Sequence, residues 1–554
     1  MTGDAYRWIR LIDGSELPDK SLIGGKAWSI AHMRALGLEV PPAFVITTEA
    51  CREFLNTGSE PADLGDELAA GVAWLQSMTG RYFGGPAPAE ESGTTPKVAE
   101  SPLLLSVRSG APISMPGMMD TILNLGIDAR TETALALESG DEDFARDTHR
   151  RFLELYTGIV MKTVGLELDA AADPAQWYRT IEQQAGAPVP GDPVEQLQQA
   201  VRAVFTSWNS RRARRYRKHH EIPDDLGTAV TVQAMVFGNL DEQSGTGVLF
   251  SRNPLSGEAA PYGEYLPRAQ GEDVVSGKFQ PEPLDTLKKV LPQVHAQLLA
   301  AAVTLEKTNR DAQDIEFTVQ KGELFLLQTR TAKRAPEAAV RMAVEMVGED
   351  LISREEALNR VTPDQVRVML RPSLVPGASD GLSPLVIGEG ACQGVGLGIV
   401  VVDPDEAEAR AREGEAVVLA RPTTSPEDVH GMIPAKAIIT EKGGSTSHAA
   451  VVSRALGLPC VVGCGEGKVV GLAGRQVTVC GETGRVYDGV LPVTAPAESD
   501  NPLLGQLIEW ARERCPVERQ PHSVEEPVLP ALLTALHAGH PDDDLETIAA
   551  QASE

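Results

Sequence analysis

The stretch that decides the organisation of this chain is KAIITEKGGSTSHAAVVSRALGLPCVVG, residues 436–463, which places His448 directly after glycine, serine and threonine residues. A Gly-Gly-Ser-Thr-Ser run fits neither a strand nor the middle of a helix, because these residues favour turns and helix caps. The apolar residues that follow recur at helical spacing, so the sequence predicts a glycine loop, an N-cap and a helix over about 447–456. His448 then lies in the first turn, where unpaired amides and the positive end of the helix dipole favour an anion.

Working outward from this helix, short Val/Ile runs alternate with helix-like segments over residues 385–493, and this predicts a compact β/α domain. Residues 1–335 mix helical patterns with β-rich runs and a glycine-punctuated hairpin, which is typical of an α+β domain. Between the two, residues 336–384 predict two or so helices followed by a Pro/Gly-rich hinge. Residues 494–554 form a Pro- and acid-rich tail with one or two amphipathic pieces.

Composition restricts the classes of partner. The chain has 554 residues with 78 acidic against 50 basic ones, and the resulting net charge of -28 opposes non-specific attraction to nucleic acid or anionic membrane. The basic run NSRRARRYRKHH is therefore interpreted as a solvated helix face. Because no segment resembles a signal peptide or a membrane span, we expect a cytoplasmic protein. Six cysteines in so long a chain predict reduced core thiols rather than a disulfide framework or a zinc site.

A candidate metal site lies in the hairpin pattern QDIEFTVQKGELFLLQTR. Asp314 and Glu316 alternate along the first strand and share a face, across a Lys-Gly turn from Gln328 and Arg330. Two such carboxylates can hold Mg²⁺, but two exposed strand carboxylates can also be merely solvated. Spacing alone leaves both interpretations open.

The stretch GGSTSHAAVVSRALGLPCVVG closely resembles the phosphohistidine motif of the pyruvate, phosphate dikinase family and of other PEP-utilising enzymes. The resemblance implies that His448 carries a phosphoryl group during turnover and that Thr446 is positioned to bond the phosphorylated ring. The family usually has Met where this chain has Ser445. A neutral imidazole suits the role, because one ring nitrogen attacks phosphorus while a hydrogen bond to the other fixes the tautomer.

The first half of the chain also resembles this family, in IGGKAWSIAHMRALGLEVPPAFVITTEAC, SVRSGAPISMPGMMDTILNLG and TAVTVQAMVFGNLDEQSGTGVLFSRNPLSGE. The resemblance implies an ATP-grasp nucleotide-binding domain over 1–335, followed by a swivelling β/β/α phosphohistidine domain over 385–493. It implies Mg²⁺ at Asp314 and Glu316, and a catalytic arginine at Arg108. The residues implied at ATP are Lys26, Arg108, Gly110, Ser114, Gly117, Met118, Gln233, Met235, Arg252, Glu264, Asp314, Glu316, Gln328 and Arg330.

The implied activity is an ATP- and phosphate-dependent phosphorylation of His448 that releases AMP and pyrophosphate. Dikinases continue with a PEP/pyruvate-binding (β/α)₈ barrel, and such a barrel takes about 250 residues. Residues 494–554 are too few for one, so we expect onward transfer to pyruvate or PEP to need a separate barrel protein.

Two other functions stay open from the sequence. One is a phosphotransferase for another small molecule, as in the rifampin-modifying relatives, although those carry a large acceptor domain between the two halves seen here. The other is a regulatory phosphohistidine relay protein, in which phosphorylated His448 is itself the output.

Overall fold

The computed structural model describes residues 6–85, 101–113, 115, 120–275, 279–370, 373–375, 377–494, 497–515 and 528–537. The chain has a mixed α/β fold with several sheets and divides into two compact units. Unit 1 contains residues 1–244 and 318–329, and unit 2 contains residues 245–317 and 330–554.

Unit 1 is built on an antiparallel sheet of five strands in the order β1-β2-β7-β5-β6. The strands are β1 (Ile9–Leu11), β2 (Ala43–Ile46), β5 (Leu105–Gly110), β6 (Thr121–Leu125) and β7 (Ala229–Ala234). A short parallel pair joins β3 (Tyr82–Phe83) to β4 (Pro102–Leu103). The central strands are buried along their whole length, because helices pack against them and remove their apolar side chains from water.

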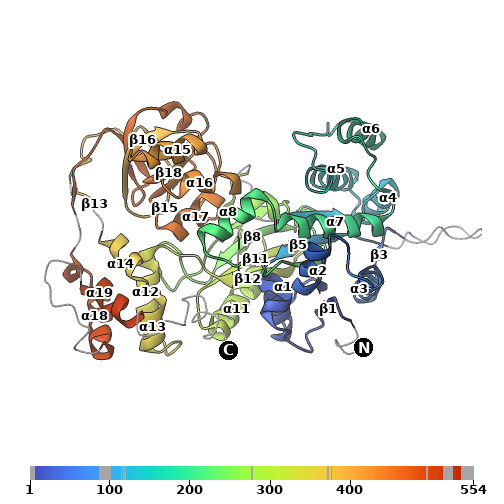
Figure 1. Ribbon diagram of the computed structural model, residues 1–554, viewed down its shortest axis with the longest axis horizontal. Helices are drawn as coiled ribbons and strands as arrows, with labels where there is room; N and C mark the ends of the chain where they lie inside the picture. The colour runs from blue at the N-terminus through green and yellow to red at the C-terminus, as the bar shows by residue number, and fades with distance from the viewer. Residues whose placement is uncertain are drawn as a thin grey trace, which may run out of the picture. The chain divides into compact units, whose positions relative to one another are not determined.

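The helices of unit 1 begin mostly at a Ser, Thr or Asp residue that caps the first turn. In Figure 1 the helices α4, α5 and α6 lie near one another at one side of the unit. Helices α5 and α6 contribute Phe152 and Trp177 to the core of unit 1. The helices are α1 (Lys20–Ala35), α2 (Thr48–Thr57), α3 (Leu64–Thr79), α4 (Ala129–Ser139), α5 (Glu142–Ile159), α6 (Pro174–Ala185), α7 (Pro193–Ser207) and α8 (Arg211–His219).

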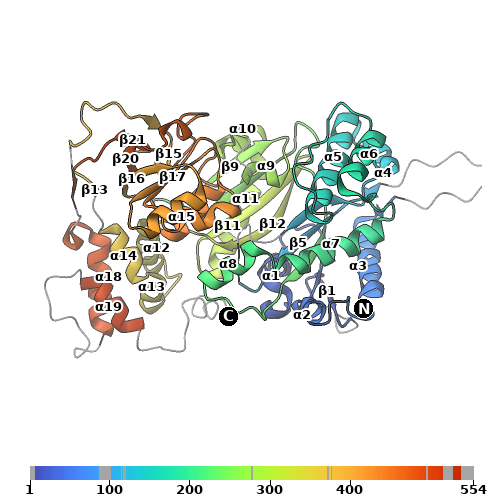
Figure 2. The same ribbon diagram turned by 45° about the horizontal axis from the view of Figure 1, so that its top comes forward.

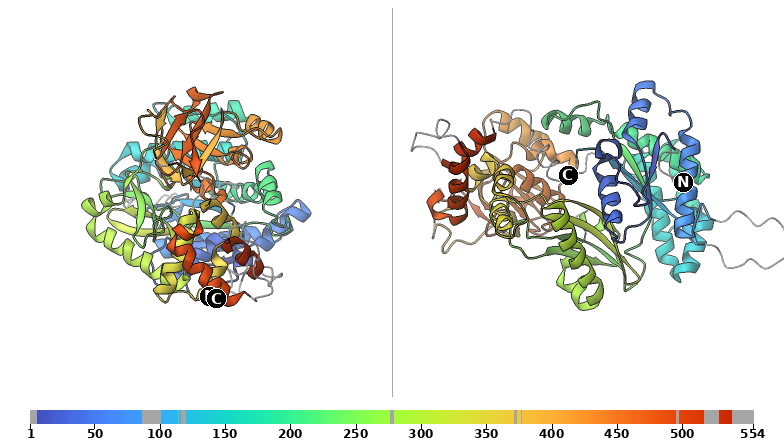
Figure 3. Two further views of the ribbon diagram at one scale, coloured as in Figure 1. Left: turned by 90° about the vertical axis from the view of Figure 1, so that its left-hand side faces the viewer. Right: turned by 90° about the horizontal axis from the view of Figure 1, so that it is seen from below.

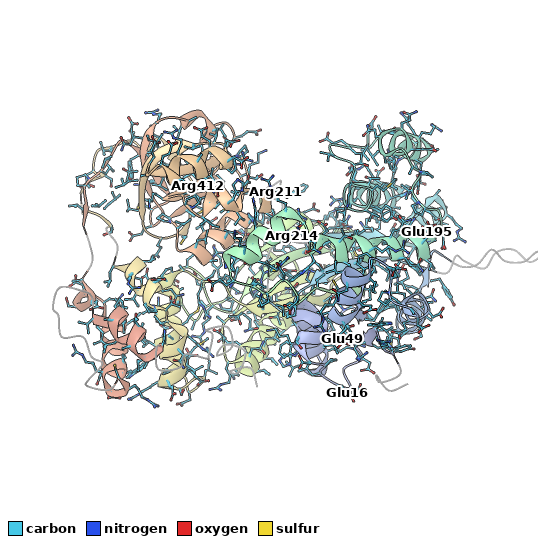
Figure 4. All side chains as sticks on the ribbon, viewed as in Figure 1. Glu16, Glu49, Glu195, Arg211, Arg214 and Arg412 are labelled. Carbon is cyan, nitrogen blue, oxygen red and sulfur yellow. The ribbon has the colours of Figure 1, made fainter. Side chains whose placement is uncertain are left out.

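The predicted solvated basic helix is confirmed as α8. Arg211 and Arg214, labelled in Figure 4, are exposed on it, whereas Ala213 and Arg217 turn inward. The buried Arg217 bonds Asp224 and the carbonyl oxygen of Trp208.

Unit 2 begins with a second five-stranded sheet in the order β10-β9-β8-β11-β12. Its strands are β8 (Gly245–Phe250), β9 (Tyr262–Pro267), β10 (Glu282–Pro283), β11 (Gln313–Gln320) and β12 (Glu323–Thr331), of which residues 318–329 belong to unit 1. The helices that accompany them are α9 (Gly271–Val275), α10 (Asp285–Val290) and α11 (Pro292–Asn309). The predicted hairpin around Lys321-Gly322 is confirmed, since β11 ends and β12 begins on either side of that turn.

The described helices within residues 336–384 and 494–554 meet in one apolar core. The first segment forms α12 (Pro336–Gly348), α13 (Arg354–Arg360) and α14 (Pro363–Met369). The sequence predicted two or so helices here, and the described residues form these three. The second forms α18 (Pro502–Arg514) and α19 (Val528–His537), whose Leu, Trp and Ala side chains pack on the first three helices. Figure 3 shows these helices in yellow and red at one end of the unit.

The third part of unit 2 is an eight-stranded sheet in the order β14-β21-β20-β16-β17-β18-β19-β15. Four central strands, β16 to β19, run parallel, and α15 (Pro404–Arg412), α16 (Val429–Met432) and α17 (His448–Leu456) lie in their connections. Figure 2 shows β20, β16 and β17 as neighbours with α15 beside them. The strands are β14 (Val386–Ile387), β15 (Glu389–Cys392), β16 (Val395–Val401), β17 (Val417–Arg421), β18 (Ala437–Thr440), β19 (Cys460–Val462), β20 (Gln476–Cys480) and β21 (Arg485–Asp488). A separate pair joins β13 (Ser373–Leu374) to β22 (Val493–Thr494).

Two further predictions can be compared with the fold. All six cysteines are free and buried, which confirms the prediction of core thiols. Among the described helices, none is both long enough and apolar enough to cross a membrane.

Candidate active site

The histidine helix begins where the sequence predicts. Strand β18 ends at Thr440, the chain turns through Gly443 with a positive φ of 106°, and Ser447 is the extended N-cap of α17. A side chain on Gly443 would lie 2.9 Å from the Ser447 Cβ atom, so both its backbone angle and the available space require glycine. Ser447 does not cap the helix with its side chain, and its hydroxyl is buried without a hydrogen-bond partner among the described residues. The first turn of α17 is thus not closed off by its own N-cap side chain.

The imidazole of His448 is partly buried and neutral. Its Nδ1 atom lies 3.0 Å from Thr424 Oγ1, and its Nε2 atom is buried without a partner in the described part of the chain. Burial lowers the pKa of His448 to about 4, and the nearby Asp428 opposes this shift only partly. When Nδ1–H donates to Thr424, the lone pair of the ring stays on Nε2. This nitrogen is therefore the available nucleophile.

Thr424 is a residue that the sequence analysis missed. It follows β17 in the polar run PTTSPED, and His448 follows β18, the parallel neighbour of β17. Parallel neighbours bring their carboxyl ends to the same edge of a sheet, so loops after both strands meet there. The strand order, once known, is the signal that could have identified Thr424.

With His448 unphosphorylated, Thr446 bonds a carboxylate of β9. Its hydroxyl donates a short hydrogen bond to Glu264 of β9, and Ser445 Oγ donates to the same carboxylate over 3.1 Å. The hydroxyl of Tyr262 lies 2.6 Å from Ser445 Oγ and 3.0 Å from Glu389 Oε1. Burial raises the pKa of Glu264, while the hydroxyls of Thr446 and Ser445 counteract that effect. In this conformation the Glu264 carboxylate is bonded to the loop before His448.

The β11–β12 hairpin brings three of the expected side chains together. Arg330 Nε donates to Asp314 Oδ2 over 2.8 Å, and Glu316 lies two residues further along the same strand face. Burial raises the pKa of Asp314, and Arg330 opposes the shift. The other oxygen, Oδ1, is buried and has no hydrogen-bond partner among the described residues. Carboxylate oxygens are the ligands that Mg²⁺ prefers, so this pair fits a hard cation. Gln328 lies on β12 in the part that belongs to unit 1.

In unit 1, the first glycine motif lies against the end of β5. Gly24 has a positive φ of 75°, and a Cβ atom there would lie 1.9 Å from the carbonyl oxygen of Gly110. The amide of Gly25 donates to the carbonyl oxygen of Ala111 over 2.9 Å. A Cβ on Gly110 would meet Lys26 Cβ at 3.2 Å, so the structure brings Lys26 and Gly110 together, with Arg108 on the same strand. The glycines let the backbone of α1 approach β5 this closely.

The remaining expected residues differ in their surroundings. Ser114, Gly117 and Met118 lie outside the described residues. Gln233 is buried on β7 and donates its side-chain amide to the carbonyl oxygen of Pro41, and Met235 packs on the unit 1 core.

Arg252, in unit 2, is engaged by two carboxylates. Its guanidinium is buried and forms hydrogen bonds with Glu306 and Glu349. In this structure Arg252 is therefore already neutralised by two carboxylates.

Two family models match this chain. Residues 20–75 and 90–296 match the AMP/ATP-binding domain of pyruvate phosphate dikinase. Residues 413–484, which include His448 and Thr424, match the mobile domain of PEP-utilising enzymes.

Several curated relatives are similar over most of the chain. It is 42% identical over 528 residues to pyruvate, phosphate dikinase 2 of Oryza sativa subsp. japonica, an alignment with 89% of this chain and 58% of the relative. It is 40% identical over 541 residues to pyruvate, phosphate dikinase of Clostridium symbiosum, with 91% and 60% covered, respectively. The enzyme of Rhizobium meliloti (strain 1021) is 40% identical over 542 residues, with 89% and 58% covered. The chain thus spans about three fifths of the length of these relatives.

Proposed function

Because this chain belongs to the pyruvate, phosphate dikinase family, we propose that it is an ATP- and phosphate-dependent phosphotransferase that phosphorylates its own His448. The β-phosphoryl group of ATP is transferred to His448 and AMP leaves, while the γ-phosphoryl group joins inorganic phosphate as pyrophosphate. The observation that carries this proposal is the neutral His448, whose Nε2 atom is buried and has no partner among the described residues.

The residues around His448 support the transfer step. The hydrogen bond between Nδ1 and Thr424 keeps the lone pair on Nε2 and aims the ring. As the bond from Nε2 to phosphorus forms, the P–O bond to AMP breaks. The positive end of α17 stabilises the phosphoryl group on the ring, because a helix N-terminus favours negative charge.

We propose Mg²⁺ at Asp314 and Glu316, where it would neutralise negative charge on the nucleotide. Asp314 Oδ1, buried without a partner among the described residues, fits such an ion. Lys26, Arg108 and Gly110 are proposed to contact the phosphates, an assignment supported by the match of their segment to an AMP/ATP-binding domain.

We further propose an ATP-grasp fold for residues 1–335 and a swivelling phosphohistidine domain for residues 385–493, with 336–384 as the linker. The match of residues 413–484 to a mobile domain supports the swivelling assignment. A cytoplasmic location stays part of the proposal, because ATP and phosphate are available there.

The proposed final acceptor is pyruvate, in a reversible reaction that produces PEP. No sheet of the described residues is a (β/α)₈ barrel. We propose that the acceptor binds to a barrel protein that the phosphohistidine domain reaches, and adding a dikinase barrel in trans tests this. Discharge of the labelled chain by pyruvate only in the presence of the barrel supports the proposal, whereas discharge by pyruvate alone contradicts it.

The central test is labelling of the purified chain with [β-³²P]ATP, Mg²⁺ and phosphate. We expect acid-labile, base-stable label that His448→Ala abolishes. His430→Ala is the matched control, because His430 is the other partly buried histidine of the eight-stranded-sheet domain and lies on α16 with its ring beside Asp405. Label that persists in His448→Ala would exclude His448 as the carrier.

A further inference from the structure

A buried arginine on the histidine helix has a hydrogen-bonding edge that nothing in the proposed reaction uses. Arg454 lies on α17 and is only 2% exposed. Its Nη1 atom donates to the carbonyl oxygen of Ala391 over 3.2 Å. Its Nε and Nη2 atoms are buried and have no hydrogen-bond partner among the described residues. These two atoms form the edge with which a guanidinium binds the two oxygens of a carboxylate or phosphate.

The position of Arg454 points to one carboxylate. Its guanidinium lies 6.0 Å from the ring centre of Phe250, at the end of β8. The next residue, Ser251, donates its amide to the carbonyl oxygen of Gln313, so β11 runs beside this point. Asp314 follows on β11, is 3% exposed, and keeps Oδ1 without a partner in the described part of the chain. Arg454 and Asp314 interact electrostatically in this structure.

Leaving these groups unpaired is costly. A buried donor or acceptor without a partner costs about 1–3 kcal/mol, and more when it is charged. Burial also lowers the pKa of Arg454, as expected for a cation without a closely bonded counter-ion. If the Nε/Nη2 edge of Arg454 bonds Asp314 Oδ1, the unpaired donors and the unpaired acceptor are satisfied together.

We propose that Arg454 is a positioning residue whose Nε/Nη2 edge pairs with Asp314 Oδ1, directly or through one water molecule, in competition with Mg²⁺ for that oxygen. The inference rests on the proposed function, in which Asp314 is a metal ligand. Arg454 belongs to α17, the helix that begins at His448. Metal binding at Asp314 is therefore linked to the position of that helix relative to β11. Mg²⁺ loosens the pairing, and the pairing weakens Mg²⁺ binding by the same factor.

The test measures metal binding and labelling separately. Mn²⁺ binding to the full chain is titrated by electron paramagnetic resonance with a non-hydrolysable ATP analogue. His448 labelling is followed in a single turnover that starts when ATP and Mg²⁺ are added to the metal-free chain, in which the pairing positions the helix. For Arg454→Met we expect Mn²⁺ to bind about 3- to 10-fold more tightly, because a competing positive charge near the ligand is lost. Labelling slows about 10-fold, because the helix is no longer positioned. Simple damage to the site would instead weaken metal binding.

Two variants make the comparison specific. Arg412→Met removes the same charge from α15, where Arg412 is exposed (Figure 4), and should leave both measurements within about 2-fold of the unchanged chain. Arg454→Lys keeps the charge but loses the two-pronged edge, so labelling slows while Mn²⁺ affinity changes little. If Arg454→Met does not fold, as judged by circular dichroism, the lysine variant carries the test. Unslowed labelling in the lysine variant would overturn the proposal.

The outcome for Asp314→Asn separates this inference from the function it rests on. If the asparagine variant binds Mn²⁺ as the unchanged chain does, the proposed metal site is wrong. If it weakens Mn²⁺ binding but Arg454→Met does not tighten it, only the role of Arg454 is wrong. Mn²⁺ titration needs no phosphorylation, so a chain that never labels His448 still gives both answers.

Discussion

The surroundings of His448 and those of Asp314 show two different ways to prepare a buried polar group. Around His448 the direct partner is a neutral hydroxyl, that of Thr424, and burial outweighs the nearby Asp428 in setting the protonation state of the ring. Around Asp314 the neighbours are charged, with Arg330 bonded and Glu316 and Arg454 close enough to interact. A nucleophilic imidazole needs a free lone pair, and burial beside a neutral hydroxyl keeps the ring unprotonated. A site for metal and phosphate needs charged side chains that can change partners when these ligands bind. The two regions should therefore respond differently to mutation and to pH.

The largest effect is expected where charge is removed from the nucleotide site. Removing one contact that stabilises transition-state charge typically costs about 2.7–4 kcal/mol of barrier, so Arg108→Ala or Glu316→Ala should slow His448 labelling by about 10²–10³. Single-turnover labelling with [β-³²P]ATP measures this. Glu323→Gln is the control for Glu316, since Glu323 is an exposed acid on the same hairpin. Labelling at the unchanged rate in both variants would refute the charge-based assignment of this region.

A smaller effect is expected at the neutral region. Thr424→Val removes the hydroxyl that holds Nδ1, and the loss of one hydrogen bond of about 1 kcal/mol should slow labelling by about 10-fold or less. Thr424→Ser should restore the rate, because it returns the hydroxyl. Thr423→Val, at the adjacent residue, serves as the control for a methyl group in the same loop. If the serine variant is as slow as the valine variant, the hydroxyl of Thr424 does not orient the ring.

The smallest effect concerns stability and pH. The pKa of His448 is lowered to about 4 from an ordinary value of 6.5, so below pH 6.5 the unfolded chain binds a proton at this residue more readily than the folded chain does. The folded protein therefore loses stability through His448 as the pH falls from 6.5 towards 4. His448→Gln cannot take up this proton, so its free energy of unfolding relative to the unchanged chain should improve by about 1 kcal/mol between pH 7.5 and pH 5.8. Urea unfolding at the two pH values measures the difference, and a constant difference would show that the folded chain does not lower this pKa.

Much of the local structure could be predicted from the sequence. The helix that was predicted over about 447–456 and is observed over 448–456, and the hairpin around Lys321 and Gly322, follow from side-chain periodicity and from the residues that suit turns. The match to the dikinase family confirms the resemblance seen in the motifs. Which residues bind the nucleotide and the metal stays a prediction.

The partners of individual side chains were harder to predict. Thr446 was expected to bond the phosphorylated histidine ring, and this stays a prediction; in this structure its hydroxyl bonds Glu264, and Thr424 lies at the unphosphorylated ring. The difference arises because Thr424 and His448 follow neighbouring parallel strands, and that neighbourhood is set by the strand order of the sheet. The family usually has Met at the position of Ser445. Only the structure shows that the Ser445 hydroxyl forms hydrogen bonds with Tyr262 and Glu264.

The sequence by itself determined the periodic elements, the glycine turns and the position of His448 at a helix start, because these depend on residues close together in the chain. Only the tertiary structure decided which distant segments meet. It packed α18 and α19 on α12, α13 and α14, although about 130 residues separate the two groups, and it left two atoms of Arg454 and one oxygen of Asp314 buried without partners among the described residues. Apolar burial is non-directional, so no local pattern states which partner a buried face will find. Polar groups carried into that interior are then paired or left unpaired by the packing itself.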